Sequence, residues 1–168
     1  MSTLSTEPRV IDVEPQPAVS VRVTLPMEGL DLGALYGKNF PLVARTVGEH
    51  GGAPAGAPFG LYHQWGPDVV DVEVGFPVAG SVNGLPALAD APPGEPGNSS
   101  LPGGRVVMAT HVGPYSGLAD ANAKLHAWIE SEGLEIAGGL WESYVDDPGA
   151  TPESELRTEI FWPVAPAG

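Results

Sequence analysis

Two short segments near the end of this sequence combine carboxylates with aromatic side chains. One reads Trp-Glu-Ser-Tyr over residues 141–144, and the other reads Glu-Ile-Phe over residues 159–161. Aromatic rings attract cations over their faces, and a half-buried carboxylate gains most from a cationic partner. The pattern predicts a binding site for an organic cation, although the same residue types are also ordinary on a solvated sheet face. The candidate ligand-binding residues are Trp141, Glu142, Tyr144, Glu159 and Phe161.

These segments have counterparts earlier in the chain. Residues 139–144 repeat the pattern of residues 60–65, and residues 158–165 repeat the pattern of residues 72–79. A duplicated unit predicts a pseudo-symmetric domain, and such domains tend to hold a ligand groove between their copies. The alignment adds three candidates from the first copy to the predicted site, namely Tyr62, His63 and Trp65.

The composition argues against several classes of protein. A net charge of −14, with only seven Lys and Arg residues, makes a nucleic-acid partner unexpected, because phosphate contact needs clustered cations. The same acidic field attracts cations, but it also serves solubility alone. The absence of cysteine from the sequence excludes disulfides, thiol nucleophiles and thiolate metal sites.

Membrane and cofactor signals are weak throughout the sequence. No apolar run approaches the roughly 20 residues of a membrane span, and residues 1–8 lack the apolar core of a signal peptide. We therefore expect a cytoplasmic protein without a membrane partner. The histidines show no paired metal-ligand spacing and no phosphate-binding glycine motif is found, so we expect neither a metal nor a cofactor.

Hydrophobic periodicity predicts an α+β domain. We expect a loose tail over residues 1–8, a first copy over 9–79, a linker over 80–104 and a second copy over 105–165. Each copy is predicted to run strand, helix, strand, strand, with the helix on one face of the sheet. Pro41 is expected to bend or split the first helix. The predicted elements are strands at 19–25, 59–65 and 69–76 with a helix at 32–49, then strands at 105–111, 139–144 and 156–162 with a helix at 116–132.

Strand alternation assigns the candidate residues to faces of the sheet. Glu159 and Phe161 are expected to point away from the helix that covers their strand. We expect Glu142 to join Glu159 on that face, in a cleft with aromatic walls. In the first copy, His63 and Trp65 are expected on the same side of their strand because they are two residues apart.

Several motifs of the second copy resemble one known family. They are His111-Val112-Gly113-Pro114-Tyr115, a helix that ends near Trp128, the string from Gly139 to Tyr144, Asp147-Pro148, and Arg157-Thr158-Glu159-Ile160 through Pro163-Val164. In this order they resemble the GyrI-like small-molecule-binding domain, which also forms the effector-binding half of several bacterial multidrug-sensing transcription activators. The resemblance covers roughly residues 9–165.

The resemblance implies two strand-helix-strand-strand modules with pseudo-twofold symmetry and a central groove for bulky, apolar, often cationic ligands. It implies that Glu142, Glu159 and Phe161 bind the ligand and that Tyr144 forms a wall. His63 departs from the acid at the matching place, so the groove is expected to be electrostatically asymmetric. The sensors of this family carry a DNA-binding helix-turn-helix, for which this chain has neither room nor charge, so it resembles a stand-alone member.

Two functions follow from the resemblance. The first is a binding protein that sequesters, buffers or senses bulky hydrophobic, cationic xenobiotics. The second is a hydrolase, because some stand-alone members open strained cyclopropane rings in DNA-alkylating natural products with an aromatic cage. The resemblance then implies that Trp141, Tyr144 and Trp65 form walls and that Glu142 orients or deprotonates a water. His63 is a second candidate acid or base, since histidine titrates near neutrality.

Overall fold

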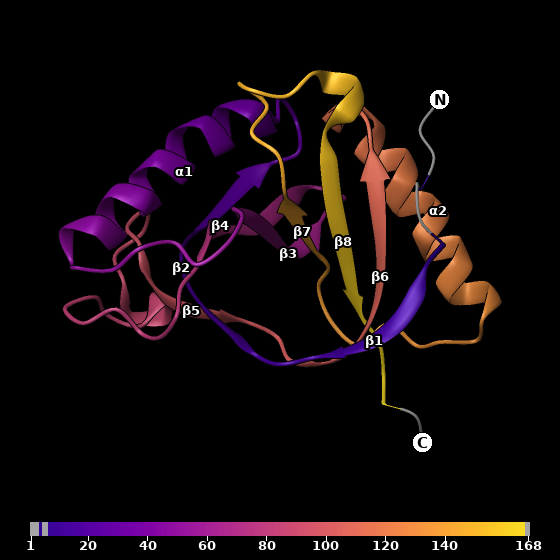
Figure 1. Cartoon of the computed structure of the whole chain (residues 1–168), viewed down its shortest axis with the longest axis horizontal. Coiled ribbons are helices and arrows are strands. Elements are labelled where there is room, and N and C mark those ends of the chain that lie inside the picture. Colours follow the sequence, from indigo (N-terminus) through magenta and orange to yellow (C-terminus); the bar gives the residue numbers. More distant parts are fainter. Residues whose placement is uncertain (1–3, 5–6, 167–168) are drawn as a thin grey trace. The chain divides into compact units, whose positions relative to one another are not determined.

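The computed structural model describes residue 4 and residues 7–166. Within these residues the chain forms eight strands and two α-helices (Figure 1). It divides into two compact units, of which one spans Pro15–Pro102 and the other combines Met1–Glu14 with Gly103–Gly168. Each unit contains four strands and one α-helix, which confirms the predicted α+β class.

The unit of residues 15–102 is an antiparallel sheet with α1 on one face. Its strands lie in the order β5-β2-β4-β3. Its elements are β2 (Gln16–Pro26), α1 (Leu32–Glu49), β3 (Phe59–Trp65), β4 (Val69–Pro77), the 3-10 turn η1 (Leu88–Asp90) and β5 (Gly97–Leu101).

Alternating valines fix the face of this sheet that α1 covers. Val19 and Val21 of β2 pack against Val43 and Val47 of α1, and all four are fully buried. Burying each of these side chains contributes about 1.5 kcal/mol. Residues of β2 and β4 that alternate with this set, such as Glu73, must therefore point to the opposite face.

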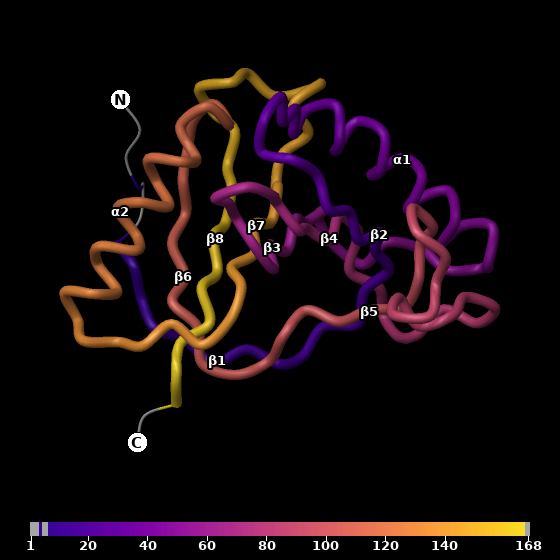
Figure 2. The backbone as a smooth tube through the Cα atoms, turned by 180° about the vertical axis from the view of Figure 1, so that it is seen from behind, coloured from indigo at the N-terminus to yellow at the C-terminus, as the bar shows by residue number. Residues whose placement is uncertain are grey.

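Helix α1 begins at a clear capping signal. The Asp31 side chain accepts a hydrogen bond of 3.0 Å from the backbone N–H of Ala34, which satisfies one of the free donors of the first turn. The helix runs from Leu32 to Glu49 without interruption, so Pro41 does not split it. In both views of the chain α1 lies beside β2 and β4 (Figures 1 and 2).

The unit that contains residues 103–166 is a second antiparallel sheet with one helix. Its strands lie in the order β1-β6-β8-β7. Its elements are β1 (Arg9–Val13), β6 (Gly104–Val112), the 3-10 turn η2 (Tyr115–Gly117), α2 (Leu118–Ser131), β7 (Trp141–Tyr144), the 3-10 turn η3 (Glu153–Glu155) and β8 (Arg157–Pro163). Helix α2 runs beside β6 in both views (Figures 1 and 2).

Helix α2 buries Leu118, Ala121, Leu125 and Ile129, which follow one another at helical spacing. The imidazole of His126 lies 5.3 Å from the ring of Trp162 in β8. The helix therefore covers the face of β8 that carries Thr158, Ile160 and Trp162, because these side chains alternate with Glu159 and Phe161.

Strand pairing adds detail to the expected division of the chain at two points. Strand β1, at residues 9–13, pairs with β6. The expected linker contains β5, which pairs with β2. The expected tail lies partly outside the described residues, and Leu4 within it forms an isolated bridge with His111.

Candidate functional site

Each unit buries one glutamate. Glu142 in β7 is 4% exposed, and Glu73 in β4 is 5% exposed. Removing a carboxylate from water is unfavourable unless hydrogen bonds or a cation replace the lost hydration. The partners of these two side chains therefore indicate what each location can bind.

Glu142 points to the face of its sheet that α2 covers. It lies opposite Ile160 in the pairing of β7 with β8. Asn122 of α2 donates a hydrogen bond of 2.8 Å from Nδ2 to Oε2 of Glu142. The Tyr144 hydroxyl, two residues along β7 and thus on the same face, donates one of 2.8 Å to Oε1.

Burial raises the pKa of the Glu142 carboxyl above its ordinary value. The hydrogen bonds from Asn122 and Tyr144 favour the ionised form, as does the nearby His111, but these effects are smaller. The negative charge of Glu142 is thus supported mainly by neutral donors. A cation beside this carboxylate would supply what the protein does not.

Two tyrosine rings lie beside this carboxylate. Tyr115 of η2 meets Tyr144 edge to face, with ring centroids 5.5 Å apart. The pKa of the Tyr115 phenol is raised, first by burial and then by the negative charges of Asp146, Asp147 and Glu142. The region around Tyr115 therefore has a negative potential, which favours a cation over an anion.

The second predicted carboxylate, Glu159, lies on the other face of this sheet. It pairs with Ser143, whereas Glu142 pairs with Ile160. The expectation that Glu142 and Glu159 share the face turned away from the helix is therefore wrong. Alternation sorts side chains into two sets within a strand, but it does not say which set of β7 the helix covers.

The predicted aromatic residues Trp141 and Phe161 accompany Glu159. They are cross-strand neighbours whose rings stack in parallel, with centroids 5.0 Å apart and planes at 11°. Trp141 is buried and Phe161 is half-buried. The unit thus separates the predicted residues into Glu142 with Tyr144 on the helix face and Trp141, Glu159 and Phe161 on the opposite face.

A β-bulge divides the first-copy candidates in a similar way. Tyr62 lies opposite Val72, and Trp65 lies opposite Val70. Both side chains therefore share the α1 face, although a separation of three residues would place them on opposite faces of a regular strand. Their rings meet edge to face at 5.7 Å. His63, the extra residue of the bulge, points to the opposite face. His63 and Trp65 therefore do not share a side, contrary to the expectation from simple alternation.

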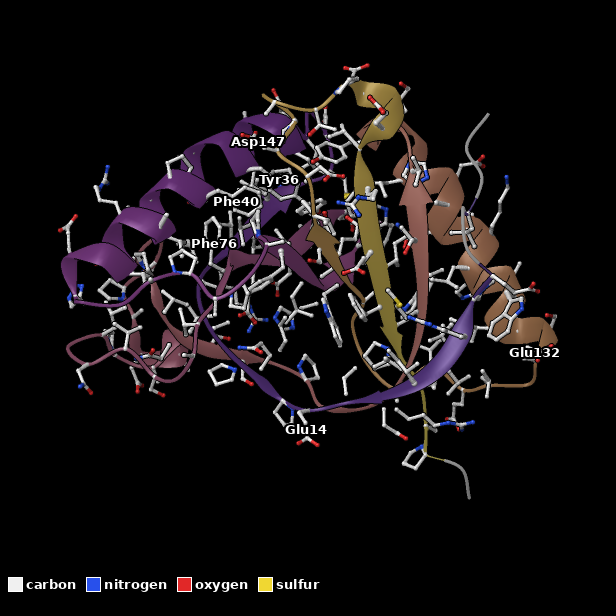
Figure 3. The ribbon with its side chains drawn as sticks, in the orientation of Figure 1. Glu14, Tyr36, Phe40, Phe76, Glu132 and Asp147 are labelled. Carbon is white, nitrogen blue, oxygen red and sulfur yellow. The ribbon has the colours of Figure 1, made fainter. Side chains whose placement is uncertain are left out.

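The Tyr62 ring belongs to a larger aromatic row beneath α1. The hydroxyls of Tyr62 and Tyr36 are hydrogen-bonded. Tyr36 stacks on Phe40 at 5.2 Å, and Phe40 meets Phe76 edge to face at 5.9 Å. Figure 3 shows these three rings gathered beneath the helix. Tyr36 and Phe40 were not among the predicted site residues, although they are spaced i, i+4 on the predicted helix.

Glu73 is held by a different set of groups on the face away from α1. Its Oε1 accepts hydrogen bonds from the hydroxyls of Ser20 (2.8 Å) and Ser99 (2.6 Å). His63 Nε2 lies 2.6 Å from Oε2. Glu73 and the two serines were not among the predicted site residues, and Ser99 lies in the segment that was expected to be a linker.

Gly75 permits this arrangement. It lies opposite Ser20 in the pairing of β2 with β4. A Cβ atom at Gly75 would lie 2.1 Å from the carbonyl oxygen of Val19 and 2.8 Å from Cβ of Ser20. Only glycine allows β2 to approach β4 closely enough for the fully buried Ser20 to reach Glu73.

An open hollow lies at the start of α2 and is lined by residues between His111 and Asp120. His111 lines this hollow and also acts electrostatically on Glu142. In the part of the chain that the structure describes, no group of three or more His, Asp or Glu side chains is placed to hold a metal ion. Neither described helix is long and apolar enough to cross a membrane.

Comparison with known proteins adds a family and a fold. The family model of the GyrI-like small molecule binding domain matches residues 6–165. Sequence comparison with curated proteins gives no match. Among solved structures, the C-terminal domain of EcmrR is 22% identical, with a TM-score of 0.77, over 96% of this chain and 98% of that domain. In the complex of EcmrR with DNA, this chain spans 57% of the EcmrR chain.

Two more distant structures share the fold. SAV2435 bound to tetraphenylphosphonium is 13% identical, with a TM-score of 0.65, over 95% of this chain and 94% of that one. A hydrolase from Listeria innocua is 16% identical, with a TM-score of 0.59, over 95% of this chain and 92% of that one. At these identities the similarity establishes the fold alone.

Proposed function

From the fact that this chain belongs to the family of GyrI-like small-molecule-binding domains, we propose that it binds bulky hydrophobic small molecules that carry a positive charge. The binding would serve to sense or sequester such compounds. Glu142 is the residue that we assign to the positive charge of the ligand, with Tyr144 and Tyr115 as aromatic contacts.

The observation that carries this proposal is the environment of Glu142. The carboxylate is buried, its hydrogen-bond donors are the neutral groups of Asn122 and Tyr144, and its pKa is raised by burial. No ion pair of Glu142 occurs among the described residues. A ligand cation would stabilise the ionised form, and tyrosine rings attract the same cation over their faces.

Two further observations support a cationic ligand. Asp146 and Asp147 add negative potential at Tyr115, although Asp146 also pairs with the exposed guanidinium of Arg157. The structural neighbour SAV2435 is seen with tetraphenylphosphonium, a bulky aromatic cation. The other predicted contacts, Trp141, Glu159 and Phe161, remain candidates for a second part of the binding surface, as do Tyr62, His63 and Trp65.

The test is a fluorescence titration with rhodamine 6G, on wild type and on Glu142→Gln. We expect wild type to bind in the micromolar range, about −8 kcal/mol, and the variant to bind at least tenfold more weakly, about 1.4 kcal/mol. Glu132→Gln is the matched control, because it removes an exposed carboxylate beyond α2 and makes the net charge less negative by the same one unit (Figure 3). Equal weakening by both variants would assign the effect to net charge instead of to Glu142.

A second candidate function is hydrolysis of strained cyclopropane rings in DNA-alkylating natural products. The pair of His63 and Glu73 favours it, since Glu73 orients one ring nitrogen while the His63 side chain is 33% exposed. A histidine held in this way can accept a proton from water through its other nitrogen. A structural neighbour from Listeria innocua is described as a hydrolase.

Mass spectrometry tests this second function. Incubation with an electrophilic cyclopropane should give a product heavier by one water, and His63→Gln should abolish formation of this product. Absence of product with wild type over a range of such substrates would leave binding as the function.

A further inference from the structure

Two buried polar atoms near Glu142 have no hydrogen-bond partner within the part of the chain that the structure describes. They are Thr158 Oγ1 and Asn122 Oδ1. Thr158 is fully buried. Buried polar groups in folded proteins are almost always paired, so two unpaired atoms in one neighbourhood need an explanation.

Thr158 lies beside the carboxylate of Glu142. It is opposite Tyr144 on one side and opposite His111 on the other. Glu142 lies opposite Ile160, in the next row of the same face. Side chains in neighbouring rows on one face lie within about 8 Å of each other. Thr158 therefore faces the same covered space as Glu142 and the Tyr144 hydroxyl.

The orientation of the Asn122 amide is fixed by its partners. Nδ2 donates to the carbonyl oxygen of Leu118 at 3.0 Å and to Oε2 of Glu142 at 2.8 Å. Both of these atoms are acceptors only, so the amide nitrogen must face them and Oδ1 must be the remaining acceptor. What is missing beside Glu142 is a donor, because Asn122 Oδ1 can only accept and Thr158 Oγ1 can accept as well.

The unit of residues 15–102 lacks this pattern. Asn39 of α1 donates to the carbonyl oxygen of Leu35, as Asn122 does to that of Leu118. Tyr62 lies opposite Val72, as Tyr144 lies opposite Thr158. A valine thus stands where the other unit has the unpaired hydroxyl. The unpaired set is a particular feature of the Glu142 region and does not follow from the strand-helix-strand-strand order.

We infer that the Glu142 region selects ligands whose cation is a protonated amine with N–H donors, in preference to quaternary ammonium or phosphonium cations of the same size. The N–H groups would donate to Glu142, Asn122 Oδ1 and Thr158 Oγ1. A quaternary cation carries no donor and would leave these two atoms unpaired. This inference rests on the proposed function, since it names the class of cation that the same site accepts.

The experiment compares two probes with one aromatic body. They are 9-(aminomethyl)anthracene, protonated at neutral pH, and its N,N,N-trimethylammonium analogue. Fluorescence titrations at one pH and one ionic strength give both dissociation constants. We expect the primary ammonium to bind at least tenfold more tightly than the quaternary analogue, because sites built around a hydrogen bond reject ligands that lack the partner.

Thr158→Val separates this inference from general affinity for amines. The substitution keeps the shape of the side chain and removes the hydroxyl, so it should reduce the preference severalfold without weakening the quaternary probe. Ser143→Ala removes a hydroxyl from the opposite face of the same strand pair and should leave the preference unchanged. Thermal melts of both variants establish that they fold.

The outcomes distinguish the inference from the proposed function. Equal binding of both probes to wild type overturns the inference and leaves cation binding intact. Failure of both probes to bind wild type overturns the inference and the proposed function together. A preference that survives in full in Thr158→Val also overturns the inference, because the hydroxyl would then have no part in it.

Discussion

Glu73 and Glu142 are buried to nearly the same degree, yet they lie on different faces of their sheets and have different hydrogen-bond partners. Glu73 lies on the face away from α1, where two serine hydroxyls and the imidazole of His63 converge on it. Glu142 lies on the face that α2 covers, where it receives one amide and one phenol hydrogen bond. Burial alone therefore does not mark a binding site. What distinguishes the two carboxylates is whether the protein itself supplies their full set of partners.

This difference between the two carboxylates arises from the residues at corresponding positions of the two sheets. Val72 and Thr158 precede Pro77 and Pro163 by the same number of residues, and each lies opposite a tyrosine of the neighbouring strand. The residue two positions before that tyrosine is Gly60 in one unit and Glu142 in the other. At this position the unit of residues 15–102 thus has a glycine in place of the carboxylate, and its buried Glu73 has its partners on the other face.

Gly75→Ala should have the largest effect on stability, because a methyl group at this position would force β2 away from β4. The Glu73 cluster depends on the close approach of these two strands. The new Cβ would lie 2.1 Å from a backbone oxygen, so we expect a loss of about 3 kcal/mol in the free energy of unfolding, measured with urea. Gly37→Ala in α1 meets no atom within 4 Å and should instead stabilise by about 0.5 kcal/mol. A neutral Gly75→Ala would mean that the strands can separate without consequence.

Glu73→Gln should destabilise the protein by about 2 kcal/mol at neutral pH. Both serines and His63 donate to the carboxylate, and a glutamine offers only one oxygen to them. Urea unfolding of the variant and wild type at the same pH gives the difference. An unchanged stability would show that the free-energy cost of desolvating the Glu73 carboxylate equals the free energy gained from its hydrogen bonds.

Glu142→Gln should act in the opposite direction and stabilise the protein by about 1 kcal/mol at neutral pH, since a neutral amide avoids the desolvation of the charge. The Tyr144 hydroxyl can rotate to accept from the new amide group. Burial raises the folded-state pKa of Glu142 above the ordinary value of 4.5, so folding favours the protonated form. The penalty in wild type is therefore complete above the raised pKa and disappears below pH 4.5.

The measurement is a series of thermal melts of both proteins from pH 4 upward. The two proteins should converge in stability at the acid end and diverge as the pH rises through the folded-state pKa of Glu142. A constant difference over the whole range would show that Glu142 titrates alike in the folded and unfolded chain.

Arg22→Gln should have the smallest effect. The guanidinium forms a bidentate pair with Asp71 at 2.9 and 2.7 Å, but its side chain is 51% exposed. Exposed pairs contribute about 0.5 kcal/mol and less in high salt. A loss above 1 kcal/mol, insensitive to salt, would indicate that Arg22 supports the neighbouring Glu73 cluster instead of a surface pair.

The sequence predicted the elements better than the contacts. Hydrophobic periodicity was sufficient to predict β4, α2 and a helix on one face of each sheet, because burial of apolar side chains leaves few alternatives. The same reasoning could not locate β5, since Gly97–Leu101 lies in a stretch of Gly, Pro and Ser without apolar alternation. That strand forms by pairing with β2, which is a tertiary effect.

The candidate site was predicted in part for the same reason. Glu142 and Tyr144 were both predicted as site residues, and the structure joins them by a hydrogen bond. Their face was not predictable, because it depends on which side of β7 receives α2. The single extra residue at His63 reversed the alternation in β3, and a bulge of this kind leaves no reliable signal in one sequence. Asn122 and Thr158 look like ordinary helix and strand residues until their partners are known.

The pairing of β1 with β6 has a consequence for how this chain comes to be folded. Arg9 pairs with Met108, a separation of 108 − 9 = 99 residues, whereas every strand of the other unit lies within Pro15–Pro102. Closing so long a loop is entropically slow compared with forming local hairpins. During synthesis the unit of residues 15–102 is complete before β6, the pairing partner of β1, has been made. The unit that carries Glu142 is thus the last to be assembled. Residues 9–13 are made first, but they can pair with β6 only after residues 104–112 have been synthesised.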